Sequence, residues 1–167
     1  MESTASVFNG AVKLGVLGGG QLGKMMAIPA ANWQLPFWVL DQDKSVPAAS
    51  YCTHFVAGDF KQEEDVLAFG RQVDVLTIEI EHVHTGALHR LKAEGVVVHP
   101  DPSILDIIKD KGLQKSFYTQ NNLPTAPYEL FADVTAIKAT SGRKMVFAIC
   151  SESRLVGTMA EGGRHSQ

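Results

Sequence analysis

Short apolar runs alternate with segments of helical periodicity along the first two thirds of the chain. The runs have the length and content of buried parallel strands, and they cover residues 12–17, 37–40, 73–80 and 96–98. Between them, apolar residues recur at helical spacing in residues 21–32, 63–72 and 84–94. Pro29 favours an early end of the first helix. Strands separated by such helices predict right-handed crossovers, and therefore a Rossmann-like α/β fold with a doubly wound parallel sheet.

A second unit is predicted after this sheet. One helix is expected from Pro102 to about Asn121, and turn formers with two prolines at 121–127 then indicate a domain junction. A short strand (128–131) and a helix (134–140) follow before the periodicity disappears. The sequence therefore predicts four parts. They are a polar lead (residues 1–11), a Rossmann-like domain (12–122), the start of a second domain (123–140) and a tail without a clear pattern (141–167).

The composition describes an ordinary globular protein. Hydrophobic residues make up 45% and charged residues 20% of the chain, and the net charge is -3, which argues against disorder and against general nucleic-acid binding. No apolar stretch approaches about 18 residues and the chain opens with Met1-Glu2, so we expect no membrane association, no signal peptide and a cytoplasmic location. The two cysteines, Cys52 and Cys150, lack the spacing of a disulfide framework or a metal site.

A glycine-rich motif joins the first predicted strand to the first predicted helix. Residues 18–23, Gly-Gly-Gly-Gln-Leu-Gly, fit G-x-G-x-x-G, and Asp41 ends the next strand. Glycines let the backbone pass close to an anion, and the amides at a helix start favour phosphate. We therefore favour a phosphate-bearing ligand, although a tight strand-to-helix turn without a ligand explains the same motif.

Two carboxylates, Glu79 and Glu81, close the third predicted strand, at the sheet edge where open α/β folds bind ligands. Residues i and i+2 of a strand point the same way, so both could meet a sugar hydroxyl, an amine or a magnesium ion. An exposed, charged strand end is the alternative. His82 and His84 alternate nearby, but two histidines without a third ligand make a weak metal site, and none is assigned.

Taken in order and spacing, five segments resemble one family. They are Gly-Gly-Gly-Gln-Leu-Gly-Lys-Met at 18–25, Asp41, Glu-Ile-Glu at 79–81, Ile-Lys-Asp-Lys with Gln-Lys within 108–115, and Leu-Pro-Thr-Ala-Pro at 123–127. The family is N5-carboxyaminoimidazole ribonucleotide synthetase, the ATPase subunit of phosphoribosylaminoimidazole carboxylase, in the ATP-grasp superfamily. The likeness covers about residues 12–138.

The resemblance implies a pre-ATP-grasp domain that holds 5-aminoimidazole ribonucleotide, followed by the truncated start of an ATP-grasp domain. In the family, ATP and bicarbonate carboxylate the amine of this ribonucleotide in de novo purine synthesis, with magnesium, and dimers are common. By position, Glu79 would face the ribose, and Lys111 would contact ATP where most relatives have arginine. The candidate substrate-binding residues are Gly20, Gln21, Leu22, Asp41, Glu79 and Glu81, with no catalytic residue assigned.

The resemblance ends in the tail. Family members continue into a strand with an ATP-binding lysine, a loop resembling Thr-Gly-Gly-Tyr-Asp-Gly-Arg-Gly and magnesium-binding carboxylates, none of which is present as the chain reads. Codons for residues 154–162, read two bases later, permit every residue of that loop. We therefore interpret the tail as the product of a frameshift between about Thr140 and Arg154. The ATP and magnesium elements are then largely missing, and we expect the chain to be inactive alone.

Two other functions fit part of this pattern. The glycine motif with Asp41 also satisfies the fingerprint of a stand-alone dinucleotide-binding module, regulatory or oxidoreductase. If the tail is genuine, the chain is instead a non-catalytic ribonucleotide-binding protein.

Overall fold

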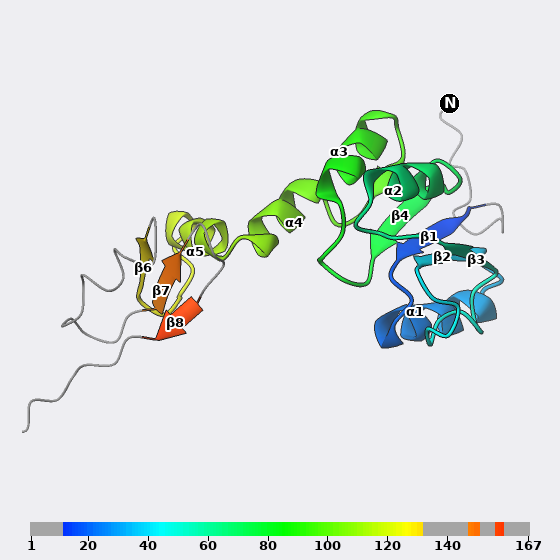
Figure 1. The fold of residues 1–167 in the computed structure, drawn as a ribbon, viewed down its shortest axis with the longest axis horizontal. Helices are drawn as coiled ribbons and strands as arrows, with labels where there is room; N and C mark the ends of the chain where they lie inside the picture. The colour runs from blue at the N-terminus through cyan, green and yellow to red at the C-terminus, as the bar shows by residue number, and fades with distance from the viewer. Residues whose placement is uncertain (1–11, 132–146, 151–155, 159–167) are drawn as a thin grey trace, which may run out of the picture. The chain divides into compact units, whose positions relative to one another are not determined.

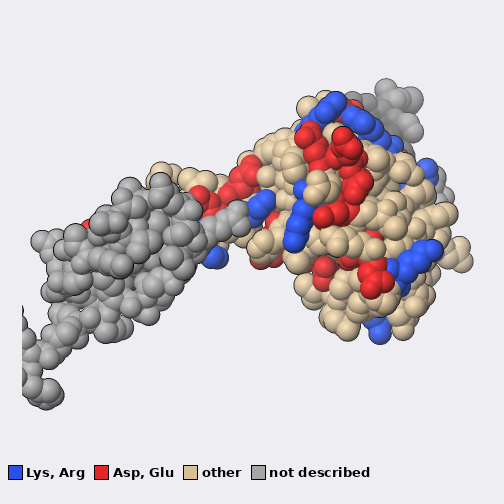
Figure 2. Space-filling model, viewed as in Figure 1, with Lys and Arg blue, Asp and Glu red and all other residues tan. Residues whose placement is uncertain are grey.

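The computed structural model describes residues 12–131, 147–150 and 156–158. The chain divides into two compact units, Met1–Asp106 and Ile107–Gln167, which are described separately. None of the helices in the described part of the chain has both the length and the apolar character needed to cross a membrane. On the face of the first unit seen in Figure 2, acidic and basic side chains are interspersed.

The first unit is built on a five-stranded sheet in the order β3-β2-β1-β4-β5, and every neighbouring pair is parallel (Figure 1). The strands are β1 (Leu14–Leu17), β2 (Phe37–Asp41), β3 (His54–Ala57), β4 (Val75–Ile78) and β5 (Val97–Val98). The predicted α/β fold with a parallel sheet is therefore confirmed. Strand β3 is an edge strand that the sequence pattern did not predict.

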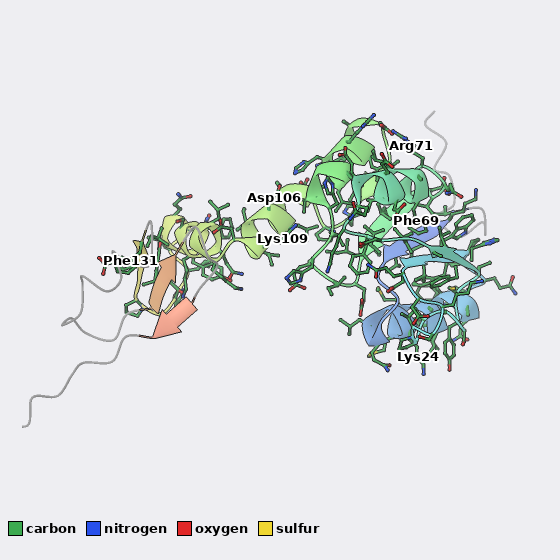
Figure 3. The ribbon with its side chains drawn as sticks, in the orientation of Figure 1. Lys24, Phe69, Arg71, Asp106, Lys109 and Phe131 are labelled. Atoms are coloured by element: carbon green, nitrogen blue, oxygen red, sulfur yellow. The ribbon has the colours of Figure 1, made fainter. Side chains whose placement is uncertain are left out.

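Helices cover both faces of this sheet. They are α1 (Gln21–Asn32) on one face and α2 (Glu63–Gly70) and α3 (Thr85–Ala93) on the other, and α4 (Pro102–Lys109), which follows β5, adds Leu105 to the core. Successive strand residues point to opposite faces, so Val16 packs with Ala27 of α1, whereas Leu17 packs in a second core with Phe69 of α2 and Leu88 of α3. Figure 3 labels Phe69 between α2 and the sheet. A parallel sheet with helices on both faces is the doubly wound arrangement that the pattern predicted.

One helix has its predicted limits despite the proline near its end, and another predicted helix is divided in two. Helix α1 continues through Pro29 to Asn32, and the Pro29 carbonyl accepts a hydrogen bond from the Trp33 amide at 3.2 Å. The predicted single helix from Pro102 to about Asn121 is two helices, α4 and α5 (Lys111–Gln120). It breaks because Asp110 is extended and its carboxylate accepts the amides of Gly112 and Leu113, as an N-cap does.

The second unit contains α5 and a three-stranded sheet in the order β6-β7-β8. Strand β6 (Tyr128–Phe131) was predicted, and it pairs in parallel with β7 (Phe147–Cys150), which pairs antiparallel with β8 (Val156–Thr158). Strands β7 and β8 lie in the segment that showed no periodicity. The predicted helix at 134–140 lies outside the described residues. Lys115 of α5 donates to Thr125 Oγ1 and so fastens the proline-rich junction to its helix.

Candidate functional site

The glycine loop, Gly18–Gly20, connects β1 directly to α1 at the carboxyl edge of the sheet. The Gly18 amide donates to the Leu40 carbonyl at 3.0 Å, and Gly18 has a φ of 98°, which side-chain-bearing residues rarely adopt. Because β1 lies between β2 and β4, the loop is flanked by the ends of both neighbouring strands. This edge is where parallel α/β sheets place ligands.

Glu79 lies against the glycine loop. A Cβ built on Gly20 would stand 2.5 Å from Glu79 Oε1, and one on Gly18 would stand 2.6 Å from Glu79 Oε2. The Glu79 amide also donates to the Leu17 carbonyl at 2.9 Å, which ties its backbone to the end of β1. The half-buried Glu79 carboxylate therefore occupies the space that the missing side chains of Gly18 and Gly20 leave.

Asp41 braces the same loop from β2. Its Oδ2 accepts the Gly19 amide at 2.7 Å, and its Oδ1 accepts the amide of Gln42 at 2.7 Å. Both oxygens of this half-buried carboxylate are thus engaged by backbone donors of the protein. Charge-assisted bonds of this kind are among the stronger hydrogen bonds in proteins.

The segment after β2 forms the other wall of the loop, and sequence reasoning missed it. The Ala48 amide donates to the Gly19 carbonyl at 2.9 Å, and a Cβ on Gly19 would stand 2.5 Å from Val46 Cγ2. Sequence reasoning likewise left Gly18 out of the candidate residues. The run of three glycines was the signal that could have identified Gly18. A turn in which the backbone approaches a ligand at a single point does not require three glycines.

Gln21 and Leu22 open α1 beside the loop and are both exposed. Gly20 is the N-cap residue, and no side chain caps the helix. The positive end of the helix dipole at this point favours a negatively charged or hydrogen-bond-accepting group. Gly20, Gln21, Leu22, Asp41 and Glu79 are therefore brought together by the structure.

Glu81 does not join this group as the sequence suggested. Strand β4 ends at Ile78, so the alternation of a strand does not place Glu81 beside Glu79. Glu81 is exposed and pairs with His82 Nδ1 at 3.3 Å. His84 accepts the Ala87 amide on Nδ1 at 3.0 Å and caps α3. The two histidines thus have contacts that need no metal.

Lys111 begins α5 in the second unit, so it is described apart from the glycine loop. Its ammonium group is exposed and contacts the neutral Gln114 Oε1 at 3.2 Å. The amides of the first turn of α5 are already bonded to Asp110. Within the described ranges, no three His, Cys, Asp or Glu side chains come together as a metal site.

Residues 11–109 match the family model described as the ribonucleotide synthetase preATP-grasp domain. Among curated proteins, the chloroplastic phosphoribosylaminoimidazole carboxylase of Vigna aconitifolia is 38% identical over 127 residues, a match that covers 76% of this chain and 23% of that protein.

Two solved structures have the same fold with sequence identity of about a third. N5-carboxyaminoimidazole ribonucleotide synthetase from Thermotoga maritima superposes with a TM-score of 0.78 at 31% identity, covering 90% of this chain and 41% of that one. The Aspergillus clavatus synthase in complex with ADP and 5-aminoimidazole ribonucleotide gives 0.76 at 30% identity, with the same coverage. The chain spans less than half the length of these relatives.

Proposed function

The chain belongs to the N5-carboxyaminoimidazole ribonucleotide synthetase family, which it matches in the pre-ATP-grasp domain, and on this premise we propose that it supplies the ribonucleotide-binding part of an ATP-dependent carbon–nitrogen ligase. In the proposed reaction, 5-aminoimidazole ribonucleotide is carboxylated with bicarbonate to N5-carboxyaminoimidazole ribonucleotide, a step of de novo purine biosynthesis. ATP activates the bicarbonate. A relative from Aspergillus clavatus is described in complex with ADP and this ribonucleotide, which supports the choice of ligand.

The position of Glu79 carries this proposal. Its carboxylate lies against Gly18 and Gly20 at the carboxyl edge of the sheet, where it can accept hydrogen bonds from ribose hydroxyls. Beside it, the uncapped start of α1 offers the backbone amides of Gln21 and Leu22 to an acceptor on the same ligand. A sugar with hydroxyl donors and a nearby acceptor matches both surfaces. We assign Glu81, which is exposed and nearby in sequence, to an outer contact with the ligand.

For the other ligands of the reaction, we assign one residue to ATP and none to magnesium. Lys111 suits an ionic contact to ATP phosphates because its exposed ammonium group bonds only a neutral amide among the contacts of the described residues. The described residues contain no cluster that fits magnesium, so no step is assigned to that ion. We propose that the 167 residues bind ribonucleotide without completing the reaction, and that the protein is a cytoplasmic homodimer.

The dinucleotide-binding alternative fits the structure less well. In that function, pyrophosphate lies over the glycine motif and the carboxylate at the end of the second strand takes ribose hydroxyls. Here Glu79 covers two glycines of the loop, and Asp41 is turned to the Gly19 amide. A pyrophosphate at the loop would therefore meet the negative charge of Glu79 at close range.

Binding measurements on the full chain test the proposal. Isothermal titration calorimetry should show saturable binding of 5-aminoimidazole ribonucleotide and none of NADH. Glu79→Gln should weaken ribonucleotide binding by about ten- to a hundredfold, the usual cost of a charge-assisted hydrogen bond. Glu64→Gln, which removes an exposed carboxylate on α2, is the matched control and should bind as the unaltered chain does. Binding of NADH instead of the ribonucleotide would refute the proposal in favour of the dinucleotide module.

A further inference from the structure

We propose that Asp41 is a positioning residue, which holds the glycine loop in the shape that lets Glu79 meet the ligand. The inference rests on the proposed function, since it concerns how the same ribonucleotide site is assembled. It differs from the sequence-based assignment, in which Asp41 belonged to the substrate-binding residues.

The hydrogen bonds of Asp41 point inward, to the protein. Oδ2 accepts the Gly19 amide and Oδ1 accepts the Gln42 amide, each at 2.7 Å. Both bonds lie at the short end of the range for N–H···O contacts. These two bonds make the Asp41 carboxylate a brace for the backbone of the loop, although each oxygen keeps a further lone pair.

Gly19 links this brace to Glu79. It lies between the two glycines that contact the Glu79 carboxylate, and it is held on three sides. Asp41 binds its amide, the Ala48 amide donates to its carbonyl at 2.9 Å, and Val46 fills the space beside its Cα. Because the Glu79 backbone is fixed separately to Leu17, a shift of the loop changes the space that the Glu79 carboxylate occupies.

The same arrangement restricts the ligand. Two carboxylates, Asp41 and Glu79, lie against a loop of three residues. Negative charge from both sides disfavours a phosphate directly above the loop and favours hydroxyl or amine groups there. The ribose of the ribonucleotide, rather than its phosphate, is therefore the part that faces Gly18–Gly20.

A double-mutant cycle on the full chain tests this inference. The variants are Asp41→Ala, Glu79→Gln and the two together, with 5-aminoimidazole ribonucleotide binding measured by calorimetry. Each single substitution should weaken ribonucleotide binding about tenfold or more. The double variant should bind no more weakly than the weaker-binding single variant, because Asp41 acts through Glu79. In the absence of ligand, the amide NMR signals of the glycine loop should shift in Asp41→Ala.

Two further variants separate positioning from folding. Asp41→Asn keeps one acceptor oxygen but turns a donor toward the other backbone amide, so it should give intermediate affinity. Glu64→Gln removes an exposed carboxylate on α2, outside the loop and both of its walls, and its affinity should be unchanged. Circular dichroism confirms that each variant is folded.

The outcomes are distinct. Additive losses in the double variant, or unchanged binding by Asp41→Ala, overturn the positioning role and leave the proposed function intact. No binding by the unaltered chain overturns the proposed function together with the role of Asp41 in it.

Discussion

A methyl group added at Gly20 tests whether Glu79 needs its place against the glycine loop. Gly20 has a φ of −68°, which alanine adopts without strain, so the change acts through contact alone. The new Cβ would stand 2.5 Å from Glu79 Oε1, whereas ordinary contact begins at 3.4 Å. The carboxylate must therefore retreat by roughly 1 Å to restore van der Waals separation. No charge is removed by this substitution.

The expected effects on stability and on binding differ in size. Alanine lowers the entropy of the unfolded chain, which stabilises by about 0.4–1 kcal/mol, but it is a poorer N-cap than glycine by a similar amount. The free energy of unfolding should thus change by less than about 1 kcal/mol. Displacing the carboxylate should cost most of a charge-assisted hydrogen bond to ligand, about 1.5–3 kcal/mol, or roughly ten- to a hundredfold in ribonucleotide affinity.

Two other glycines separate backbone strain from contact with Glu79. Gly18 and Gly95 share a φ of 98°, but a Cβ on Gly95 would meet nothing within 4 Å, whereas one on Gly18 would meet Glu79 Oε2 at 2.6 Å. Gly95→Ala should therefore lose about 1–2 kcal/mol of stability through backbone strain and keep its affinity for the ribonucleotide. Gly18→Ala should show the same strain, a further loss from the contact, and weakened binding.

Urea unfolding and calorimetry measure the two quantities separately. Both tryptophans, Trp33 and Trp38, lie in the first unit, so their fluorescence reports the unfolding of the unit that holds the loop. Unchanged ribonucleotide affinity in Gly20→Ala would refute the reasoning, because the carboxylate would then bind ligand equally well from a displaced position. Weakened binding in Gly95→Ala would also refute it, since affinity would then follow stability.

Three further predictions concern the core, the acid stability and the gene. Phe69 is fully buried between α2 and the sheet, so Phe69→Ala should cost about 3–5 kcal/mol in urea unfolding. Lys92 and Ser103 bind the Asp101 carboxylate and lower its pKa from 3.8 to about 2. Since the folded-state pKa lies below the unfolded one, the stabilisation is present above about pH 4 and is lost as the pH falls toward about 2. Asp101→Asn should therefore flatten this loss of stability in unfolding experiments across that pH range. DNA sequencing across residues 154–162 should find wobble bases that encode Thr-Gly-Gly-Tyr-Asp-Gly-Arg-Gly two bases later, and incompatible bases would reject the frameshift.

The fold could be predicted because its strongest elements carry strong patterns. Helix α1 was predicted with its observed limits, since the glycine run marks its start and apolar residues recur at helical spacing along it. Strand β3 was missed because it has four residues at the edge of the sheet, where His54 and Ala57 are exposed and no continuous apolar run forms. The break at Asp110 was missed because the apolar periodicity continues across it, whereas the side-chain cap that separates α4 from α5 is a local hydrogen bond.

The candidate site could be predicted only in part. The carboxyl edge of the sheet brings Glu79 to the glycine loop, as strand order alone suggests. The pairing of Glu79 with Glu81 failed because it assumed that β4 continues beyond Ile78, and the end of a strand depends on backbone pairing that the sequence does not show. The inward bonds of Asp41 were equally invisible, because a carboxylate at a strand end has the same sequence whether it faces a ligand or a backbone amide.

The glycine motif has a different physical basis here from the one that its pattern suggests. G-x-G-x-x-G is usually taken to indicate that the backbone must approach a pyrophosphate. In this protein, Gly18 and Gly20 make room for Glu79, Gly19 for Val46, and Gly23 for the Gly18 carbonyl at 3.0 Å. Each glycine of the motif therefore has a close contact within the protein that a side chain at its position would disturb. The motif alone therefore does not distinguish a loop that makes room for a carboxylate from one that leaves its amides open to a phosphate, because the same glycine spacing allows both arrangements.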